Sequence, residues 1–338
     1  MIIRFHIVDL HLKHPFTIAR GSSSVRQTVI LELEHDGIVG FGEAAPQQRY
    51  NESIKTVSFF FETIDRQKFV DPFSLESILQ YVDSIAPQNN SAKAAIDIAL
   101  HDWIGKRLNI PLWKFWGLDK RKTPVTSFTI GIDSPSVIEQ KVHEAENYQI
   151  LKVKLGGQND EEIIKTIRKM TDKPLRVDAN EGWKVKELAR DKIQWLASQN
   201  VEFVEQPMPA NQSTDDLFWL HENVALPLIA DESVKTSADI FSLKNMFDGI
   251  NIKLMKSKGT REAIRMIHAA RALDMSVMIG CMIESSVGIS AAAHLAPLVD
   301  YADLDGNLLI DNDPFTGLEF SNGTIILNDR PGLGVFPK

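Results

Sequence analysis

Short apolar segments that each end on a charged residue recur through the second half of the chain. They read ILKVK, LRVD, EFVE, LIAD and INIK, and their last residues are Lys154, Asp178, Glu205, Asp231 and Lys253. Neighbouring ends lie 22 to 27 residues apart, which fits one strand, one helix and two short loops. The pattern predicts an α/β fold in which a barrel of parallel strands carries its functional residues at the carboxyl ends of the strands.

Three further segments complete a predicted barrel of eight strands. TPVTSFTIG precedes the charged segments, and SVMIG (ending at Gly280) and YADLD (about 301–305) follow them. Helical periodicity appears between strands, from about residue 136 to 147 and again in SKGTREAIRMIHAARAL. We therefore expect a (β/α)7β-type barrel over residues 119–308.

The first third of the chain has a different pattern. MIIRFHIVDLHL, VRQTVILELEHD and IVGFGEA alternate like strands, and Asp36-Gly37 between the last two is a strong hairpin signal. TIARGSSS, between the first two, is expected to form a mobile loop because of Gly21 and its serines. Residues 51 to 117 have a helical period. Residues 1–118 are thus predicted to form an α+β capping domain, to which the β-rich tail, 309–338, returns.

One pair of neighbours in the longest predicted helix could suggest a catalytic dyad. His101 and Asp102 lie beside an apolar helical face in SAKAAIDIALHDWIGKRL. Adjacent residues of a helix point in different directions, so a surface or packing role is favoured over a shared catalytic role.

Composition narrows the classes of function. The chain has 338 residues, 43% of them hydrophobic, and a net charge of −8. This charge and the lack of a long basic run argue against a nucleic-acid partner. No apolar stretch reaches the length of a membrane span, and the amino-terminal segment lacks the features of a signal peptide. Cys281 is the only cysteine, which fits a reducing compartment, so we expect the cytoplasm.

Three of the charged strand ends predict a metal site. Asp178, Glu205 and Asp231 follow consecutive strands and should face one barrel mouth, where like charges require a cation. Carboxylate oxygens with open coordination positions favour Mg²⁺, and we expect one ion per subunit. No histidine or cysteine lies near these positions in the sequence, which argues against zinc.

The lysines at the other strand ends predict proton transfer. Lys152 and Lys154 are two residues apart on one strand, so both should point into the barrel, where crowding beside a metal would lower their pKa. Lys253 lies four strands further on, across the mouth. Two opposed bases could remove a proton from one face of a carbon and return it to the other, while Lys152 and the metal stabilise the enediolate. The alternatives are a surface role for Lys253 and a non-catalytic barrel that binds an amino compound.

These motifs resemble the enolase superfamily, and within it the muconate-lactonising-enzyme subgroup. The matching segments are Lys152-Val153-Lys154, Asp178-Ala179-Asn180, Glu205-Gln206-Pro207, Asp231-Glu232-Ser233 and Ile252-Lys253-Leu254-Met255-Lys256. GFGEAAP and the long helix are similar to the capping domain of that family. The resemblance implies metal ligands at Asp178, Glu205 and Asp231, and catalytic lysines at Lys154, Lys253 and Lys152.

A pair of carboxylates on the eighth strand favours one activity among those of the subgroup. Asp303 and Asp305 should point the same way and suit a substrate ammonium group, and an Asp-x-Asp here resembles the dipeptide epimerases. MIESSVG at 282–288 is also similar to that family, so Cys281, Met282 and Ile283 are candidate substrate contacts. The resemblance implies an Ala-Xaa dipeptide epimerase that inverts the second residue. The alternatives are an Ala-D/L-Glu epimerase of muropeptide recycling, an N-acylamino-acid racemase and an o-succinylbenzoate synthase.

The side chain of the second substrate residue is harder to assign from the sequence. Epimerases of Ala-Glu carry an arginine in the first loop of the capping domain, and Arg20 lies close to that place. Arg26 and Arg49 are other candidates. If no arginine enters the pocket, the second residue should be small, apolar or neutral polar, which is the preference we expect. The small-molecule dipeptide is the only partner expected besides further copies of the chain in a homo-oligomer.

Overall fold

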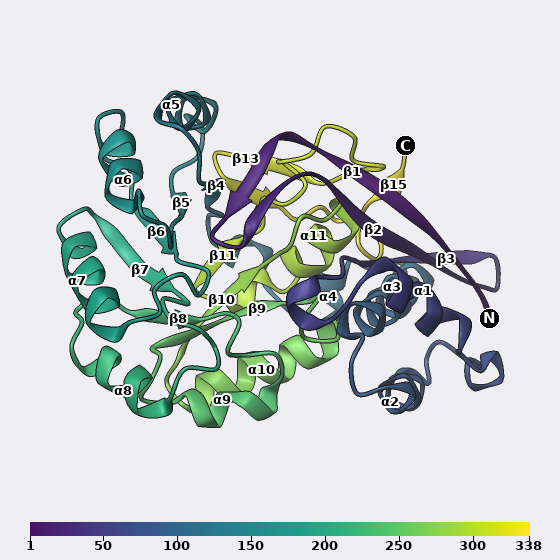
Figure 1. Cartoon of the computed structure of the whole chain (residues 1–338). Helices are drawn as coiled ribbons and strands as arrows, with labels where there is room; N and C mark the ends of the chain where they lie inside the picture. Colours follow the sequence, from purple (N-terminus) through teal and green to yellow (C-terminus); the bar gives the residue numbers. More distant parts are fainter.

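Eight parallel strands and seven helices alternate around a barrel in the computed structural model, which describes all of residues 1–338 (Figure 1). The strands are β4 (Phe128–Ile130), β5 (Leu151–Lys154), β6 (Leu175–Asp178), β7 (Val201–Glu205), β8 (Leu228–Ala230), β9 (Gly249–Lys253), β10 (Ser276–Gly280) and β11 (Tyr301–Asp303). The helices are α5 (Pro135–Glu144), α6 (Asp160–Arg168), α7 (Lys186–Ala197), α8 (Thr214–Glu222), α9 (Ser237–Leu243), α10 (Thr260–Ala272) and α11 (Ser286–Ala293). The expected (β/α)7β architecture is confirmed.

The strand order closes the barrel. Each strand pairs with its neighbour in sequence from β4 to β11, and all of these pairs are parallel. An isolated parallel bridge between Thr126 and Ala302 joins the first strand to the last. The carboxyl ends of all eight strands therefore meet at one mouth, as the five charged ends required.

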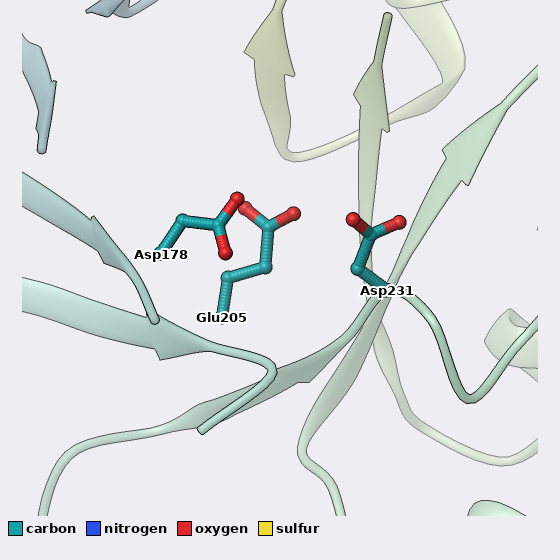
Figure 2. Close-up of side chains that lie close together, drawn as sticks. All are labelled: Asp178, Glu205 and Asp231. Carbon is teal, nitrogen blue, oxygen red and sulfur yellow. The ribbon is translucent and has the colours of Figure 1, made fainter. Parts of the chain in front are cut away.

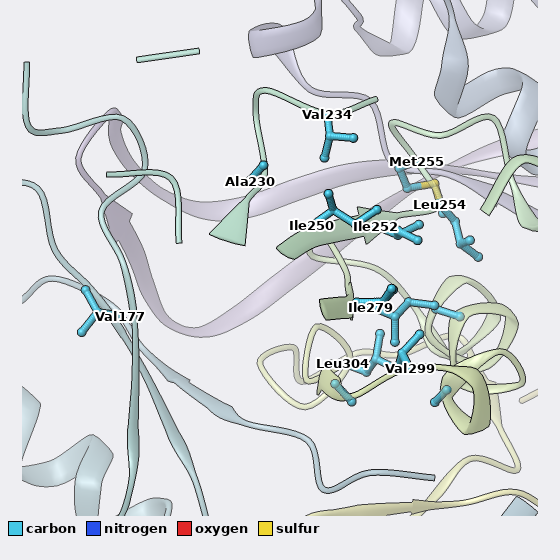
Figure 3. Packing of buried hydrophobic residues seen from close by; sticks show 14 of the residues in the cluster. Val177, Ala230, Val234, Ile250, Ile252, Leu254, Met255, Ile279, Val299 and Leu304 are labelled. Carbon is cyan, nitrogen blue, oxygen red and sulfur yellow. The ribbon is translucent and has the colours of Figure 1, made fainter. Parts of the chain in front are cut away.

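Alternation along each strand separates an outer hydrophobic core from the barrel interior. Val177, Ile250 and Ile252 point outward and pack under the helices, within a cluster of 60 buried residues (Figure 3). Inside, the lower layer is a smaller cluster of Phe203, Ile229 and Met278. The charged residues form the layer above it, because side chains two positions apart on a strand share a face.

The capping domain begins with a three-stranded antiparallel sheet, β1 (Ile2–Ile18), β2 (Gly21–His35) and β3 (Ile38–Ala44). The turn at Asp36 and Gly37 has positive φ at both residues, as the hairpin signal predicted. The prediction of a loop between the first two strands is wrong. β1 and β2 stay paired as far as Ile18 and Gly21, and Ala19 and Arg20 form the turn. Figure 1 shows this long hairpin extending from the cap toward the barrel.

Helices α1 (Ile54–Glu62), α2 (Leu75–Ile85), α3 (Asn90–Leu108) and α4 (Leu112–Phe115) complete the cap. All residues of α3 from Ser91 to Gly105 are buried, since it packs against β2, β3, α2 and α10. The close approach to β3 depends on Gly42, where a Cβ would lie 1.9 Å from the carbonyl oxygen of Ala95. Within α3, His101 contacts Thr260 and Asp102 accepts hydrogen bonds from the backbone of Phe41 and Leu333, so both have the packing role that was favoured.

The tail folds back beside the cap and the first barrel strand. It contains β12 (Phe315–Thr316), β13 (Glu319–Ser321), β14 (Thr324–Ile326) and β15 (Phe336–Pro337). The Leu112 amide donates to the carbonyl of Gly332, and Leu12 forms a bridge with Ile310. The domain boundaries at residues 118 and 308 stay a prediction. None of the helices combines the length and apolar character needed to cross a bilayer.

Candidate active site

Three carboxylates meet at the barrel mouth. Asp178 ends β6, Glu205 ends β7 and Asp231 follows β8, and Figure 2 shows their side chains directed toward one another. One oxygen from each lies within 4.8 Å of the others, and all three side chains are buried. The Oε2 atom of Glu205 is buried without a well-aligned hydrogen bond, although the Lys152 Nζ lies 2.6 Å from it. This all-oxygen set with an unused acceptor fits a hard divalent cation.

Several residues that the sequence reasoning did not single out hold these carboxylates in place. Lys256 is fully buried and bonds both the carboxylate and, at 2.5 Å, the carbonyl of Asp231. The side chain of Gln206 accepts from the Asp231 amide at 2.9 Å, and Asn251 donates to Glu205 at 2.8 Å. Lys256 and Gln206 lie within the family motifs given above. Asn251 could have been identified only from its strand position, which faces the barrel interior.

Lys154 and Lys253 contact opposite ends of the carboxylate row. The Nζ of Lys154 lies 2.7 Å from Asp178, and the Nζ of Lys253 lies 2.7 Å from Asp231. Their strands, β5 and β9, are four positions apart in the eight-stranded barrel. The surface role considered for Lys253 is wrong, because its side chain is only 7% exposed and points into the mouth.

The expected depression of the pKa is not found for Lys152. Burial lowers the pKa of Lys152, but Asp303, Glu205 and Asp178 outweigh it and raise that pKa well above its ordinary value. Lys253 behaves in the same way, through Asp231 and Glu205. The expectation considered the neighbouring lysine and the metal, whereas buried carboxylates lie around the ammonium groups of Lys152 and Lys253 and favour their charged forms.

Asp303 and Asp305 differ in the partners that they have. Asp303 accepts from Lys152 at 2.7 Å and from the Ser127 hydroxyl at 2.6 Å, and these contacts outweigh burial and lower its pKa. Asp305 accepts only from the Thr129 amide, at 2.7 Å. Burial and the charge of Asp303 raise the pKa of Asp305 to about 7. A cation beside Asp305 would relieve this burial of an uncompensated charge.

A cavity of about 740 Å³ opens above the lysines and joins the predicted substrate contacts. It is lined by residues of the barrel and of the capping domain, among them Arg20, Arg26, Arg49, Tyr50, Lys154, Lys253, Cys281, Met282, Ile283, Asp303 and Asp305. Tyr50 was missed, because it lies in a loop without periodic pattern; burial raises its pKa. Burial likewise raises the pKa of the Cys281 thiol, which leaves it unreactive as a nucleophile.

The three arginines of this cavity differ in their ion pairs. Arg20 lies 2.8 Å from Glu232 and donates to the carbonyl of Asn180, which fastens the β1–β2 turn to the barrel. Arg49 makes a two-pronged contact with Glu181. Arg26 is half-buried, has neither an ion pair nor a side-chain hydrogen bond, and burial lowers its pKa. Arg26 is therefore the cavity arginine with its full hydrogen-bonding capacity still available.

Comparison with protein families agrees with this geometry. Residues 137–338 match the family described as enolase C-terminal domain-like, and residues 2–117 match the N-terminal domain of the mandelate racemase / muconate lactonizing enzyme family. The chain belongs to this family. The enolase-superfamily resemblance, with its barrel and capping domain, is thereby confirmed.

Relatives within the family carry the names of dipeptide epimerases. An L-Ala-D/L-Glu epimerase of Bacteroides thetaiotaomicron is 50% identical over 336 residues, which cover 99% of this chain and 88% of that protein. An L-Ala-D/L-amino acid epimerase of Pedosphaera parvula is 42% identical, with both chains fully covered. A dipeptide epimerase of Cytophaga hutchinsonii, solved with Mg and D-Ala-L-Val, has a TM-score of 0.93 and 30% identity over 99% of this chain and 95% of its own. The expected resemblance to dipeptide epimerases is confirmed.

Proposed function

We propose that the protein is a dipeptide epimerase that inverts the α-carbon of the second residue by 1,1-proton transfer between two lysines. The observation that carries the proposal is the placement of Lys154 and Lys253 at opposite ends of one row of carboxylates. A carbon held between them presents one face to each amine. One lysine removes the α-proton as a base and the other, protonated, returns a proton from the opposite face.

The remaining charges of the site support the enediolate that this transfer requires. Asp178, Glu205 and Asp231 are the proposed ligands of one Mg²⁺ per subunit. Mg²⁺ there would hold the substrate carboxylate and supply positive charge as the enediolate develops. Lys152, on the same face of β5 as Lys154, adds a fixed cation beneath the carboxylates. By the family resemblance, Lys154 serves the D stereocentre and Lys253 the L stereocentre.

The proposed substrate carries a free amino terminus. Asp303 already has Lys152 and a hydroxyl as partners. Asp305 has no ion-pair partner, so it is the carboxylate that a positively charged substrate group would stabilise. The ammonium of a dipeptide carries this positive charge, whereas an N-acyl group or a succinyl group does not. The N-acylamino-acid racemase and o-succinylbenzoate synthase alternatives both leave Asp305 without a role.

For the second residue, the proposed substrate class is acidic. From the sequence we expected a small, apolar or neutral polar side chain, because no arginine could be assigned to the pocket; the three arginines that line the cavity support an acidic one instead. Arg20 and Arg49 are bound to glutamates, but Arg26 is free to form a two-pronged contact with a carboxylate. Met282, Ile283 and Cys281 are proposed apolar contacts of the substrate.

The test is epimerisation of a dipeptide panel in D₂O, in which inversion and α-deuterium incorporation are followed together by NMR. We expect kcat/KM for L-Ala-L-Glu to exceed that for L-Ala-L-Leu and that for N-acetyl-L-Glu. Arg26→Gln should remove the preference for glutamate and spare L-Ala-L-Leu, and Arg4→Gln, on the exposed face of β1, is the control. A panel in which only N-acyl amino acids react would make the protein an acylamino-acid racemase.

Two further proposals concern the setting of the enzyme. The single cysteine supports the cytoplasm as its compartment. A homo-oligomer is proposed as the assembly, and light scattering of the purified protein measures it directly.

A further inference from the structure

A second cavity, with a volume of about 450 Å³, lies beside the active-site cavity. It is formed by β1, β4, α5 and the segment that follows β11, and we call it the side pocket. Phe16, Thr129 and Leu309 line both cavities and form a wall that the two spaces share. None of the proposed metal ligands or catalytic lysines lines the side pocket.

The walls of the side pocket suit an apolar group. The rings of Phe128 and Tyr148 pack with their centroids 4.6 Å apart, and Leu308 lies on the wall with them. Of the charged groups at its edge, Lys13 is exposed to solvent and the others have partners. His14 pairs with Glu144 at 2.8 Å. Lys141 pairs in turn with Asp133 at 3.1 Å. A guest without charge therefore gains apolar contact and breaks no ion pair.

The position of the side pocket relates it to the amino end of the proposed substrate. The Thr129 amide, on the shared wall, donates to Asp305 at 2.7 Å. The pKa of Tyr148 is raised by burial and by the charge of Asp305, so this ring also lies on the Asp305 side. The ammonium and the side chain of an amino acid are attached to the same carbon. An ammonium held at Asp305 thus brings the first side chain of the dipeptide to the shared wall.

We infer that the side pocket receives the side chain of the first residue of the dipeptide, and that the enzyme accepts branched or aromatic first residues larger than alanine. The inference rests on the proposed dipeptide epimerase function and adds the class of its first residue. The volume of the pocket falls within the range of small-ligand sites, so it holds one such side chain.

Substitution of Leu308 would fill the side pocket selectively. Leu308 lines the side pocket and not the active-site cavity, and its backbone amide donates a hydrogen bond to the carbonyl of Asp305 at 2.9 Å. Leu308→Trp fills the pocket, Leu308→Met keeps its volume, and Tyr148→Ala enlarges it. All three variants keep the backbone hydrogen bond.

The experiment compares L-Leu-L-Glu with L-Ala-L-Glu in the Mg²⁺-loaded full chain. We expect the unmodified enzyme to epimerise both. Leu308→Trp should lower kcat/KM for L-Leu-L-Glu by about 10- to 200-fold, the usual effect of misfit in an apolar pocket, and change that for L-Ala-L-Glu by less than about twofold. Leu308→Met should change neither, and Tyr148→Ala should raise the relative rate of L-Trp-L-Glu.

Two results would overturn the assignment: rejection of L-Leu-L-Glu by the unmodified enzyme, or an equal loss for both dipeptides in Leu308→Trp. Calorimetric measurement of the binding of the same dipeptides tests the role of the side pocket independently of catalysis. If neither dipeptide is epimerised, the proposed function fails. In that case a binding loss confined to L-Leu-L-Glu in Leu308→Trp still supports the pocket, and binding without that selectivity overturns it as well.

Discussion

Replacement of Asp305 by asparagine tests how the site recognises a free amino terminus. Asp305 is 3% exposed and its one hydrogen bond comes from the Thr129 amide. Its pKa is raised to about 7, because burial and the charge of Asp303 outweigh the Thr129 hydrogen bond and the charge of Lys152. The substituted amide would still accept from Thr129 but would lack the charge. Loss of one partner of a desolvated charge pair costs about 2–5 kcal/mol. That range corresponds to a fall in kcat/KM for L-Ala-L-Glu of about 30- to 5,000-fold.

The assay measures kcat/KM by NMR for the free dipeptide and for its N-acetylated form. Asp305→Asn should affect the free dipeptide alone, since the N-acetyl form offers no ammonium. Because the carboxyl is protonated below its pKa, kcat/KM of the unmodified enzyme for free dipeptides should also fall as the pH drops below about 7. Equal losses for the two substrates, or no loss at all, would refute the role of Asp305 in binding the ammonium.

Three other predictions concern the metal, a buried carboxyl and the cap. Mg²⁺ at a hundredfold excess over its Kd should add about 2.7 kcal/mol to the free energy of unfolding, and Asp231→Asn should abolish the resulting rise in Tm. Burial and Glu43 raise the pKa of Glu284 to about 8. Its protonated form therefore stabilises the fold fully below pH 4.5, and this contribution is lost as the pH rises through 8. Glu284→Gln should then raise the free energy of unfolding, and with it Tm, more at pH 9 than at pH 5; the gain in free energy is at most about 1.4 kcal/mol per pH unit. Gly42→Ala should destabilise the cap by about 1–3 kcal/mol, whereas Gly157→Ala, whose new Cβ would have its nearest neighbour at 3.9 Å, should not.

The catalytic layer was predictable because it follows from a strict geometric rule. Parallel strands carry their carboxyl ends to one mouth, and a period of two residues directs every second side chain inward. A charged residue at the end of each apolar segment therefore places Asp178, Glu205 and Asp231 together without any knowledge of the loops. The same rule aligned Lys152 with Lys154 on one face of β5.

Features that depend on the path of the cap were not predictable in this way. The serines and Gly21 suggested a loop, but strand pairing between β1 and β2 satisfies the backbone up to the turn and overrides local propensity. The places of Arg20 and Arg26 depend on that register and that of Arg49 on the loop after β3, so the three arginines of the cavity could not be distinguished beforehand. Buried Asn251 and half-buried Tyr50 have functional neighbours only through contacts between distant segments.

The central claim is that Lys154 and Lys253 act on opposite faces of one carbon. The most direct measurement is α-proton exchange in D₂O for L-Ala-L-Glu and L-Ala-D-Glu with Lys154→Ala and Lys253→Ala. Both variants should lose epimerisation. Lys154→Ala should still exchange the L isomer through Lys253, and Lys253→Ala should still exchange the D isomer through Lys154. Equal exchange of both isomers in either variant, or epimerisation that survives either substitution, would contradict the account.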